Sequence, residues 1–207
     1  MTNLRIQKKT ANRAIMLEAA KQLFIERGYS KTNMEDIAEA AGFGVATLYT
    51  YFKTKEGVFA AMAKNDMSEL KAEGEEALTC LPSDPVQALL VLFHIYAKVY
   101  DYVPYAVVRD FVLNSKCSGP IHDVAVWADE WQMDQVTRAL KLCQKKGVLD
   151  RNLDAKLAAA MIVVLIRHRN NQTVEGPKTG KRLVNLKPAL KLLLKGWLTT
   201  SGKCADN

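Results

Sequence analysis

Hydrophobic positions recur at three- and four-residue spacing along most of the chain, which is the period of an amphipathic α-helix. The longest such stripe is Leu89, Phe93, Tyr96, Tyr100 and Val103, and it predicts a helix that ends at Pro104. No alternating pattern of useful length indicates a β-strand. The pattern therefore predicts an all-α fold of about nine helices.

Glycine and proline residues set the predicted ends of these helices. The predicted helices span residues 12–27, 34–41, 44–51, 55–78, 85–103, 105–114, 121–146, 154–173 and 183–200. In the first of them, the residues expected to face inward are Ile15, Ala19, Ala20, Leu23 and Phe24.

Residues 33–55, NMEDIAEAAGFGVATLYTYFKTK, predict two short helices joined by a tight glycine turn. Asn33 is a candidate N-cap with Asp36 three residues further on, close to a capping box. Gly42 can adopt the left-handed conformation that ends the first of these helices. The second helix is expected to bury Leu48 and Phe52. This arrangement is a helix-turn-helix unit, whose second helix fits the major groove of DNA.

The same segment resembles the DNA-binding domain of the TetR family of bacterial transcriptional regulators. The matching residues are Ile37-Ala38, Ala41-Gly42, Thr47-Leu48-Tyr49, Tyr51-Phe52 and Lys55-Glu56. The resemblance implies a three-helix DNA-binding domain over residues 1–55 and a larger helical domain for ligand binding and dimerisation over residues 56–207.

Carried over from the family, the expected DNA contacts are Asn33, Val45, Ala46, Thr47, Tyr49, Thr50, Tyr51 and Lys55. Lys55 and the hydroxyl groups suit phosphate oxygens, which fix orientation without reading sequence. Val45, Ala46 and the threonine methyl groups suit thymine methyl groups, and Tyr49 can reach a base or the backbone.

Two departures from the family pattern change this expectation. Gly44 stands where the family usually has serine, so one hydroxyl contact to phosphate is lost. Residues 44–51 contain no Arg, Lys, Asn or Gln, the side chains that make paired contacts with guanine or adenine. Discrimination is therefore expected to depend on apolar contacts, on Lys31 or the basic N-terminal segment, and on DNA shape.

The resemblance also implies a homodimer, a palindromic DNA operator and a small-molecule effector that releases it. The dimer is expected to form through residues 154–173, which include LAAAMIVVLI, and residues 183–200. The candidate effector contacts are Phe93, Tyr96, Tyr100, Arg109, Phe111, Trp127, Trp131 and His168, which favour a largely apolar ligand. Taken singly, each aromatic residue in this set is more often a core residue than a ligand contact, and Arg109 can equally pair with Asp110.

The net charge of +7 is unevenly distributed, with +3 in residues 1–56, −3 in residues 57–166 and +7 in residues 167–207. Arg5, Lys8, Lys9 and Arg13 precede the first predicted helix with no acidic residue among them. Such a segment can lie along DNA phosphates or remain a solvated terminus.

No apolar run is long enough to span a membrane, and the N-terminus lacks the apolar core of a signal peptide, so a cytoplasmic protein is expected. No catalytic motif stands out, and His94, His122 and His168 lack metal-ligand spacing. We therefore expect no enzyme activity, no cofactor and no metal. The alternative to a DNA-binding regulator is a helical ligand-binding module that no longer binds DNA.

Overall fold

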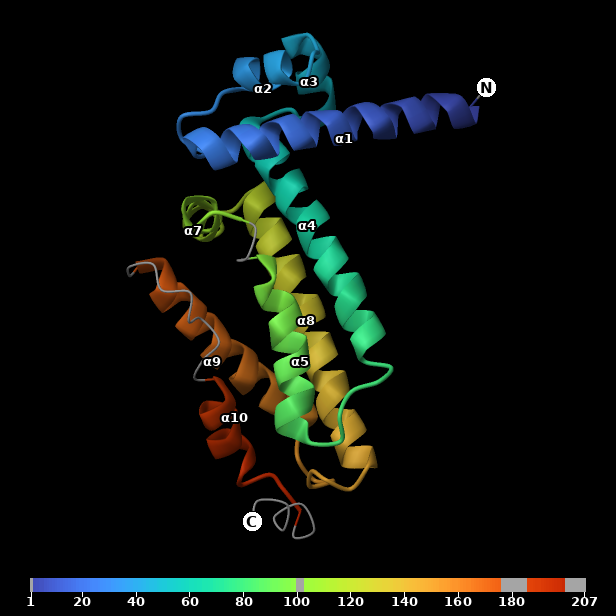
Figure 1. The fold of residues 1–207 in the computed structure, drawn as a ribbon, viewed down its shortest axis with the longest axis vertical. Coiled ribbons are helices and arrows are strands. Elements are labelled where there is room, and N and C mark those ends of the chain that lie inside the picture. The colour runs from blue at the N-terminus through green and yellow to red at the C-terminus, as the bar shows by residue number, and fades with distance from the viewer. Residues whose placement is uncertain (1, 100–102, 176–185, 200–207) are drawn as a thin grey trace. The chain divides into compact units, whose positions relative to one another are not determined.

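The computed structural model describes residues 2–99, 103–175 and 186–199 (Figure 1), and for residues 2, 3, 105 and 166–175 it describes only the backbone. The helices in these ranges are α1 (Thr2–Arg27), α2 (Met34–Ala40), α3 (Val45–Phe52), α4 (Lys55–Ala77), α5 (Pro85–Ala97), α7 (Tyr105–Asn114), α8 (Pro120–Lys145), α9 (Ala155–Glu175) and α10 (Leu186–Leu194). The described residues contain one isolated β-bridge, Leu149 with Leu198, and no strand. The all-α prediction is confirmed.

The first helix differs from its prediction in its start and in the placement of Ile15. It begins at Thr2 rather than near residue 12, because residues 2–11 contain no glycine or proline to stop it. Ile15, expected inside, is 50% exposed. Ala20, Leu23 and Phe24 are buried as predicted, and Met16 continues the four-residue spacing of Ala20 and Phe24 in place of Ile15.

Two later helices end earlier than the apolar pattern predicts. α5 ends at Ala97, and Val103 lies outside the described helices. α10 ends at Leu194, because the following residues turn to pair with the segment after α8: the Asp150 amide donates to Trp197 O at 2.9 Å, and the Thr199 amide donates to Val148 O at 3.1 Å.

The chain divides into two compact units, and α4 and α8 contribute residues to both. The first unit comprises residues 1–68 and 100–127. Its core joins α1, α2, α3, the first half of α4, α7 and the start of α8. Its most buried large side chains include Met16, Phe24, Ile37, Leu48 and Phe59.

The second unit comprises residues 69–99 and 128–207. Its core is built from α5, the second part of α8, α9 and α10, with the end of α4 and the segment around Leu149. Its most buried large side chains include Leu89, Leu92, Leu140, Leu149 and Ile162. None of the described helices has the length and apolar character needed to cross a bilayer.

Candidate nucleic-acid interface and ligand site

The α2–turn–α3 segment has the local geometry that its sequence predicts. The Asp36 amide donates to Asn33 Oδ1 at 2.7 Å, and the Asn33 amide donates to Asp36 Oδ2 at 3.2 Å, which is a complete capping box. At the other end of α2, Gly42 has φ 72°. The Phe43 amide donates to Ala38 O at 2.9 Å and the Gly42 amide donates to Glu39 O at 3.0 Å, which is a Schellman motif.

Helix α3 divides its side chains between the core and the surface. Leu48 and Phe52 are buried, at 0% and 7% exposure, and anchor the helix to α1, α2 and α4. The exposed predicted contacts are Asn33, Ala46, Thr47, Tyr49 and Thr50, while Val45, Tyr51 and Lys55 are half-buried. The structure therefore brings one exposed face of α3 together with the cap residue of α2. The roles of these residues in DNA binding stay predictions.

Local hydrogen bonds limit what two of these side chains can offer a partner. Asn33 uses its Oδ1 atom in the cap, so its side-chain NH₂ group is the part left to donate. The Thr50 hydroxyl donates back to Ala46 O at 3.0 Å, which leaves its methyl group and oxygen lone pairs for a partner.

Lys55 and Glu56, at the start of α4, hold the first unit together. Lys55 Nζ donates to Tyr29 O at 2.9 Å and lies 4.4 Å from the centre of the Tyr29 ring. Glu56 Oε1 accepts a bond of 3.4 Å from the Ile121 amide at the start of α8. Burial, with the nearby Glu56 charge, raises the pKa of Tyr29 above its usual value. Lys55 thus has a structural role in addition to its predicted phosphate contact.

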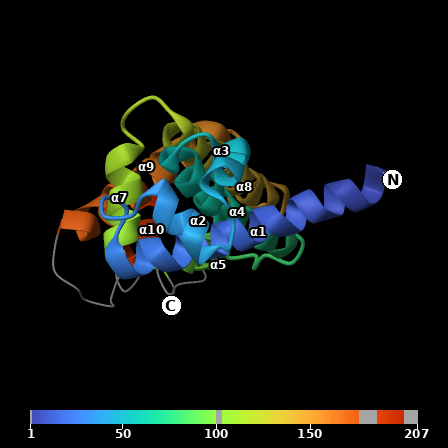
Figure 2. The ribbon, with the colours of Figure 1, turned by 90° about the horizontal axis from the view of Figure 1, so that it is seen from above.

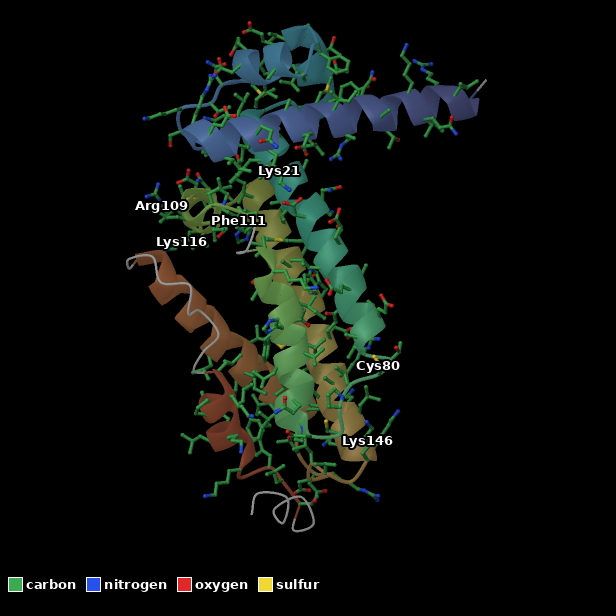
Figure 3. All side chains as sticks on the ribbon, viewed as in Figure 1. Lys21, Cys80, Arg109, Phe111, Lys116 and Lys146 are labelled. Carbon is green, nitrogen blue, oxygen red and sulfur yellow. The ribbon has the colours of Figure 1, made fainter. Side chains whose placement is uncertain are left out.

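Sequence reasoning gave no role to Lys21 and Lys53, and it left the role of Arg13 open. The Arg13 guanidinium lies 5.3 Å from the centre of the Phe52 ring at the end of α3. Lys53 caps α3 with φ 57° and is exposed, next to the predicted contact Lys55. Lys21 forms an ion pair of 3.0 Å with the buried Asp66 where α1 meets α4 (Figure 3). Helical spacing from Phe24 could have placed Arg13 on the buried side of α1.

The predicted effector contacts do not form one cluster in the described residues. In the second unit, the Tyr96 ring packs edge-on against Phe93 and Trp131, at centroid distances of 5.9 and 5.3 Å. In the first unit, Phe111 packs against Phe59, and Lys64 lies over the Trp127 ring. Arg109 is exposed and pairs with Asp110 at 3.2 Å, on the side of α7 away from Phe111 (Figure 3). The Tyr100 residue and the His168 side chain lie outside the described residues. The ligand roles stay predictions.

A buried polar junction adjoins the aromatic cluster of the second unit. Gln135, fully buried on α8, accepts a bond of 2.8 Å from the Tyr96 hydroxyl. Its amide donates at 2.9 Å to both Lys71 O and Glu75 Oε1 on α4. Gly74 makes room for it, since a Cβ there would meet Gln135 Oε1 at 2.3 Å. We call these residues, with Arg138 bound to Glu75, the Gln135 junction.

The junction also sets the protonation of its members. The hydrogen bond from Gln135, and then Arg138, hold the pKa of Glu75 below its usual range. Burial, together with the charges of Glu75 and Asp134, raises the pKa of the Tyr96 hydroxyl well above its usual value. Tyr96 therefore stays protonated and donates its hydrogen bond at any physiological pH.

An open groove of about 620 Å³ runs along α4 and α5 in the second unit. Its lining residues are Glu73, Glu76, Ala77, Cys80, Gln87, Leu90, Val91, His94, Ile95 and Lys98. None of the predicted effector contacts is among them. Among the described residues, no three His, Cys, Asp or Glu side chains lie close enough to hold a metal ion.

Helix α9 presents an aliphatic outer face. Leu157, Met161, Val164 and Leu165 are all exposed, between 39% and 62%, and recur at helical spacing. The opposite side of the helix, with Ala158, Ala159 and Ile162, is buried in the second unit. One face of this apolar helix is therefore buried against its own chain, and the other face is exposed to solvent.

These features define a helix-turn-helix protein in which one face of α3 is exposed, and comparisons with known proteins agree with this class. Residues 16–62 match the family model "Bacterial regulatory proteins, tetR family". The helix-turn-helix region of the chain therefore matches the TetR family of bacterial transcriptional regulators. The chain is similar to the uncharacterized HTH-type transcriptional regulator YhgD of Bacillus subtilis, at 38% identity over 31% of this chain and 34% of YhgD. It is also similar to the HTH-type transcriptional repressor ComR of Escherichia coli, at 33% identity over 44% of each chain.

The matches span between a third and a half of the length of these two relatives. Solved structures extend the likeness in fold to most of the chain. A TetR-family transcriptional regulator from Mesorhizobium loti has a TM-score of 0.74 at 18% identity, over 92% of this chain and 98% of that chain. Thermus thermophilus FadR, a TetR-family repressor solved in complex with lauroyl-CoA, has a TM-score of 0.68 at 23% identity. The match covers 90% of this chain and 95% of FadR. These relatives are described as transcriptional regulators.

Proposed function

We propose that this chain is a transcriptional repressor that binds a palindromic DNA operator as a homodimer and is released by a small, largely apolar effector. The observation that carries the proposal is that α3 is anchored by one buried face and exposes the other. Its Leu48 and Phe52 side chains fix it to the rest of the first unit, while Ala46, Thr47, Tyr49 and Thr50 face outward. A helix held in this way is suited to the major groove.

The contacts expected between α3 and DNA follow from those side chains. Thr47 and Tyr49 can donate hydroxyl protons to phosphate or base acceptors, and the methyl groups of Ala46, Thr47 and Thr50 can contact thymine. Lys53 and Lys55 flank the C-terminal end of α3 with positive charge for the phosphate backbone. Because α3 carries no Arg, Lys, Asn or Gln, sites rich in thymine contacts and deformable steps are favoured.

The outer face of α9 supports a dimer. Its exposed stripe of Leu157, Met161, Val164 and Leu165 is an unusual surface to leave in water, and it falls on the helix from which the family resemblance implies the interface. Two copies joined at self-complementary surfaces acquire two-fold symmetry, which matches a palindromic operator. A dimer also compensates for the few base pairs that one short helix can read.

The effector site is proposed around the aromatic cluster of the second unit. Phe93, Tyr96 and Trp131 form an apolar wall with one polar group, the Tyr96 hydroxyl. The neighbour solved with lauroyl-CoA has the same fold, which supports an apolar acyl chain as a first class of ligand to test. A ligand that displaced the Tyr96 ring would also break its bond to Gln135.

Release is proposed to act through α4. The Gln135 junction ties α4 to α8 and, through Tyr96, to α5, so its rearrangement changes how the second half of α4 packs. The same helix begins at Lys55 beside Tyr29 in the first unit. A coupling free energy of about 1–3 kcal/mol, or roughly 5–150-fold in operator affinity, is typical of such switches.

The direct test is selection of bound sequences from a pool of random DNA duplexes, followed by sedimentation of the protein with and without the selected duplex. The proposal predicts an inverted repeat bound by two protomers, and lauroyl-CoA as a probe is expected to change tryptophan fluorescence and lower the affinity. The alternative is a ligand-binding module that has lost DNA binding. The observation that supports this alternative is the lack of basic side chains on α3. It predicts a fluorescence change with no enriched duplex.

A further inference from the structure

Helix α1 extends well beyond the domain that it supports. Its buried face ends at Met16, yet the helix continues to Thr2, and Figures 1 and 2 both show it passing beyond α3 at its N-terminal end. We call residues 4–13 the arm. Arg5, Lys8, Lys9 and Arg13 are all exposed, and the first acidic residue of the chain is Glu18. No ion pair between described side chains involves Arg5, Lys8 or Lys9.

Three of the four basic side chains of the arm, Arg5, Lys9 and Arg13, share the face that α1 buries further along. At about 100° per residue, Arg5, Lys9, Arg13, Met16 and Ala20 fall within roughly 80° of one another around the helix. Met16 and Ala20 are fully buried in the core of the first unit. Arg13 marks the transition, because it is exposed yet lies over the Phe52 ring of α3. The basic face is therefore directed to the same side of α1 as the helix-turn-helix.

Helix stability does not explain this placement. Arg5 lies in the first turn of α1, where the helix macrodipole disfavours a positive charge, and that turn contains no acidic residue. From Arg5 to Arg13 the helix rises about 12 Å, and one DNA strand carries a charge about every 3.4 Å of rise. The arm can therefore lie alongside about three phosphates of one strand.

The composition of the arm favours a nucleic acid over an anionic membrane. A membrane-binding helix needs a continuous apolar face opposite its basic one. The two large apolar residues of the arm, Leu4 and Ile6, are 76% and 59% exposed but lie about 160° apart around the helix axis. They do not form such a face, whereas phosphate binding requires only the positive side chains.

We infer that the arm is a second DNA-contacting element, which binds the phosphates of the strand flanking the site read by α3. This inference rests on the proposed function. It assigns to the basic N-terminal segment, whose role the sequence left open, a phosphate contact rather than a part in sequence discrimination. The arm contributes affinity and sets the position of the protein on the duplex. It carries no base reading, because its contacts are to phosphate oxygens.

The test compares the salt dependence of operator binding in three proteins, measured by anisotropy of a labelled selected duplex. The arm variant is Arg5→Gln/Lys8→Gln/Lys9→Gln, in which glutamine preserves helix propensity. The matched control removes three other exposed positive charges, Lys116→Gln/Lys141→Gln/Lys145→Gln. The slope of log affinity against log salt is expected to fall by about 2–3 per protomer in the arm variant and to change little in the control.

A fourth protein, Arg5→Lys, keeps the charge and is expected to keep the wild-type slope, which separates loss of charge from loss of helix. Hydroxyl-radical footprints of the arm variant should lose protection at the flanking phosphates and keep it at the site read by α3. A wild-type slope in the arm variant overturns the inference while leaving the proposed function intact. Binding of the arm to phosphatidylglycerol vesicles with no change in slope overturns it as well. If the wild-type protein binds no duplex, both the inference about the arm and the proposed function are contradicted.

Discussion

Helices α3 and α9 each bury one face in their own unit and present the other to solvent, but the two outer faces differ in chemistry. The outer face of α3 carries Thr47, Tyr49 and Thr50, which combine small apolar surface with hydroxyl groups. The outer face of α9 carries Leu157, Met161 and Val164, which offer no hydrogen bond at all. The first suits a hydrated, charged partner, and the second suits an apolar protein surface from which water is excluded.

The largest expected effect comes from placing a charge on the outer face of α9. In Val164→Glu, a buried carboxylate would oppose the proposed dimer, and sedimentation should show a monomer. Operator affinity is expected to fall by about 10²–10⁴-fold, because the second reading helix no longer binds at high effective concentration. Lys156→Glu, also exposed but off the aliphatic stripe, is the matched control and should remain dimeric. A dimeric Val164→Glu protein would show that the contact lies elsewhere.

The buried face of α3 should respond very differently from its exposed face. Leu48→Ala removes a fully buried side chain and is expected to lower the free energy of unfolding by about 2–5 kcal/mol. Tyr49→Ala, at an exposed position of the same helix, should change it by about 0.5 kcal/mol or less. Urea unfolding of both variants measures the contrast. Equal losses would mean that Tyr49 is a packing residue.

Gly74→Ala probes the Gln135 junction, whose central residue Gln135 is buried inside the second unit and belongs to neither outer face. The new Cβ would collide with Gln135, so a loss of about 1–3 kcal/mol in unfolding free energy is expected despite the better helix propensity of alanine. The double variant Gly74→Ala/Gln135→Ala removes the collision. It should therefore show a favourable coupling between the two sites in a thermal or urea double-mutant cycle. Simple additivity would contradict the described packing.

The smallest expected effect concerns the charge of Glu75 in the same junction. Because the folded-state pKa of Glu75 is lowered, its contribution to stability is present above the usual glutamic acid pKa of about 4.3 and is lost as pH falls through the lower folded value. Glu75→Gln should therefore lose less stability than the wild type between neutral pH and this acidic range. Unfolding curves at several pH values test this, with the exposed neighbour Glu76→Gln as control. Parallel pH profiles for wild type and Glu75→Gln would contradict it.

The α3 region could be predicted from sequence in detail because its signals are local. Capping by Asn33, the glycine turn at Gly42 and the burial of Leu48 each depend on residues within a few positions, and the structure confirms all three. The N-terminal part of α1 was not predicted, because it carries no such local signal. Polar residues before Asn12 do not form a buried stripe, so periodicity gave no signal although the backbone has nothing to stop a helix.

Tertiary features were harder to predict from the chain. The apolar run in α9 indicated a buried helix, but which of its faces the rest of the chain covers depends on residues far away. The same holds for Gln135, whose partners Lys71 and Tyr96 lie about 40–60 positions away and leave no periodic pattern. The aromatic candidates were likewise treated as one set, whereas the structure distributes those that it describes between two units.

The central claim, that the exposed face of α3 enters a DNA duplex, is tested most directly by Thr47→Ala/Tyr49→Ala. Its affinity for the selected operator is measured at fixed salt beside Thr79→Ala, an exposed threonine of the second unit. Each lost contact is expected to cost about 1–3 kcal/mol of specific binding, so the double variant should bind at least roughly thirtyfold more weakly than the wild type and Thr79→Ala. Wild-type affinity in a correctly folded double variant would contradict the account.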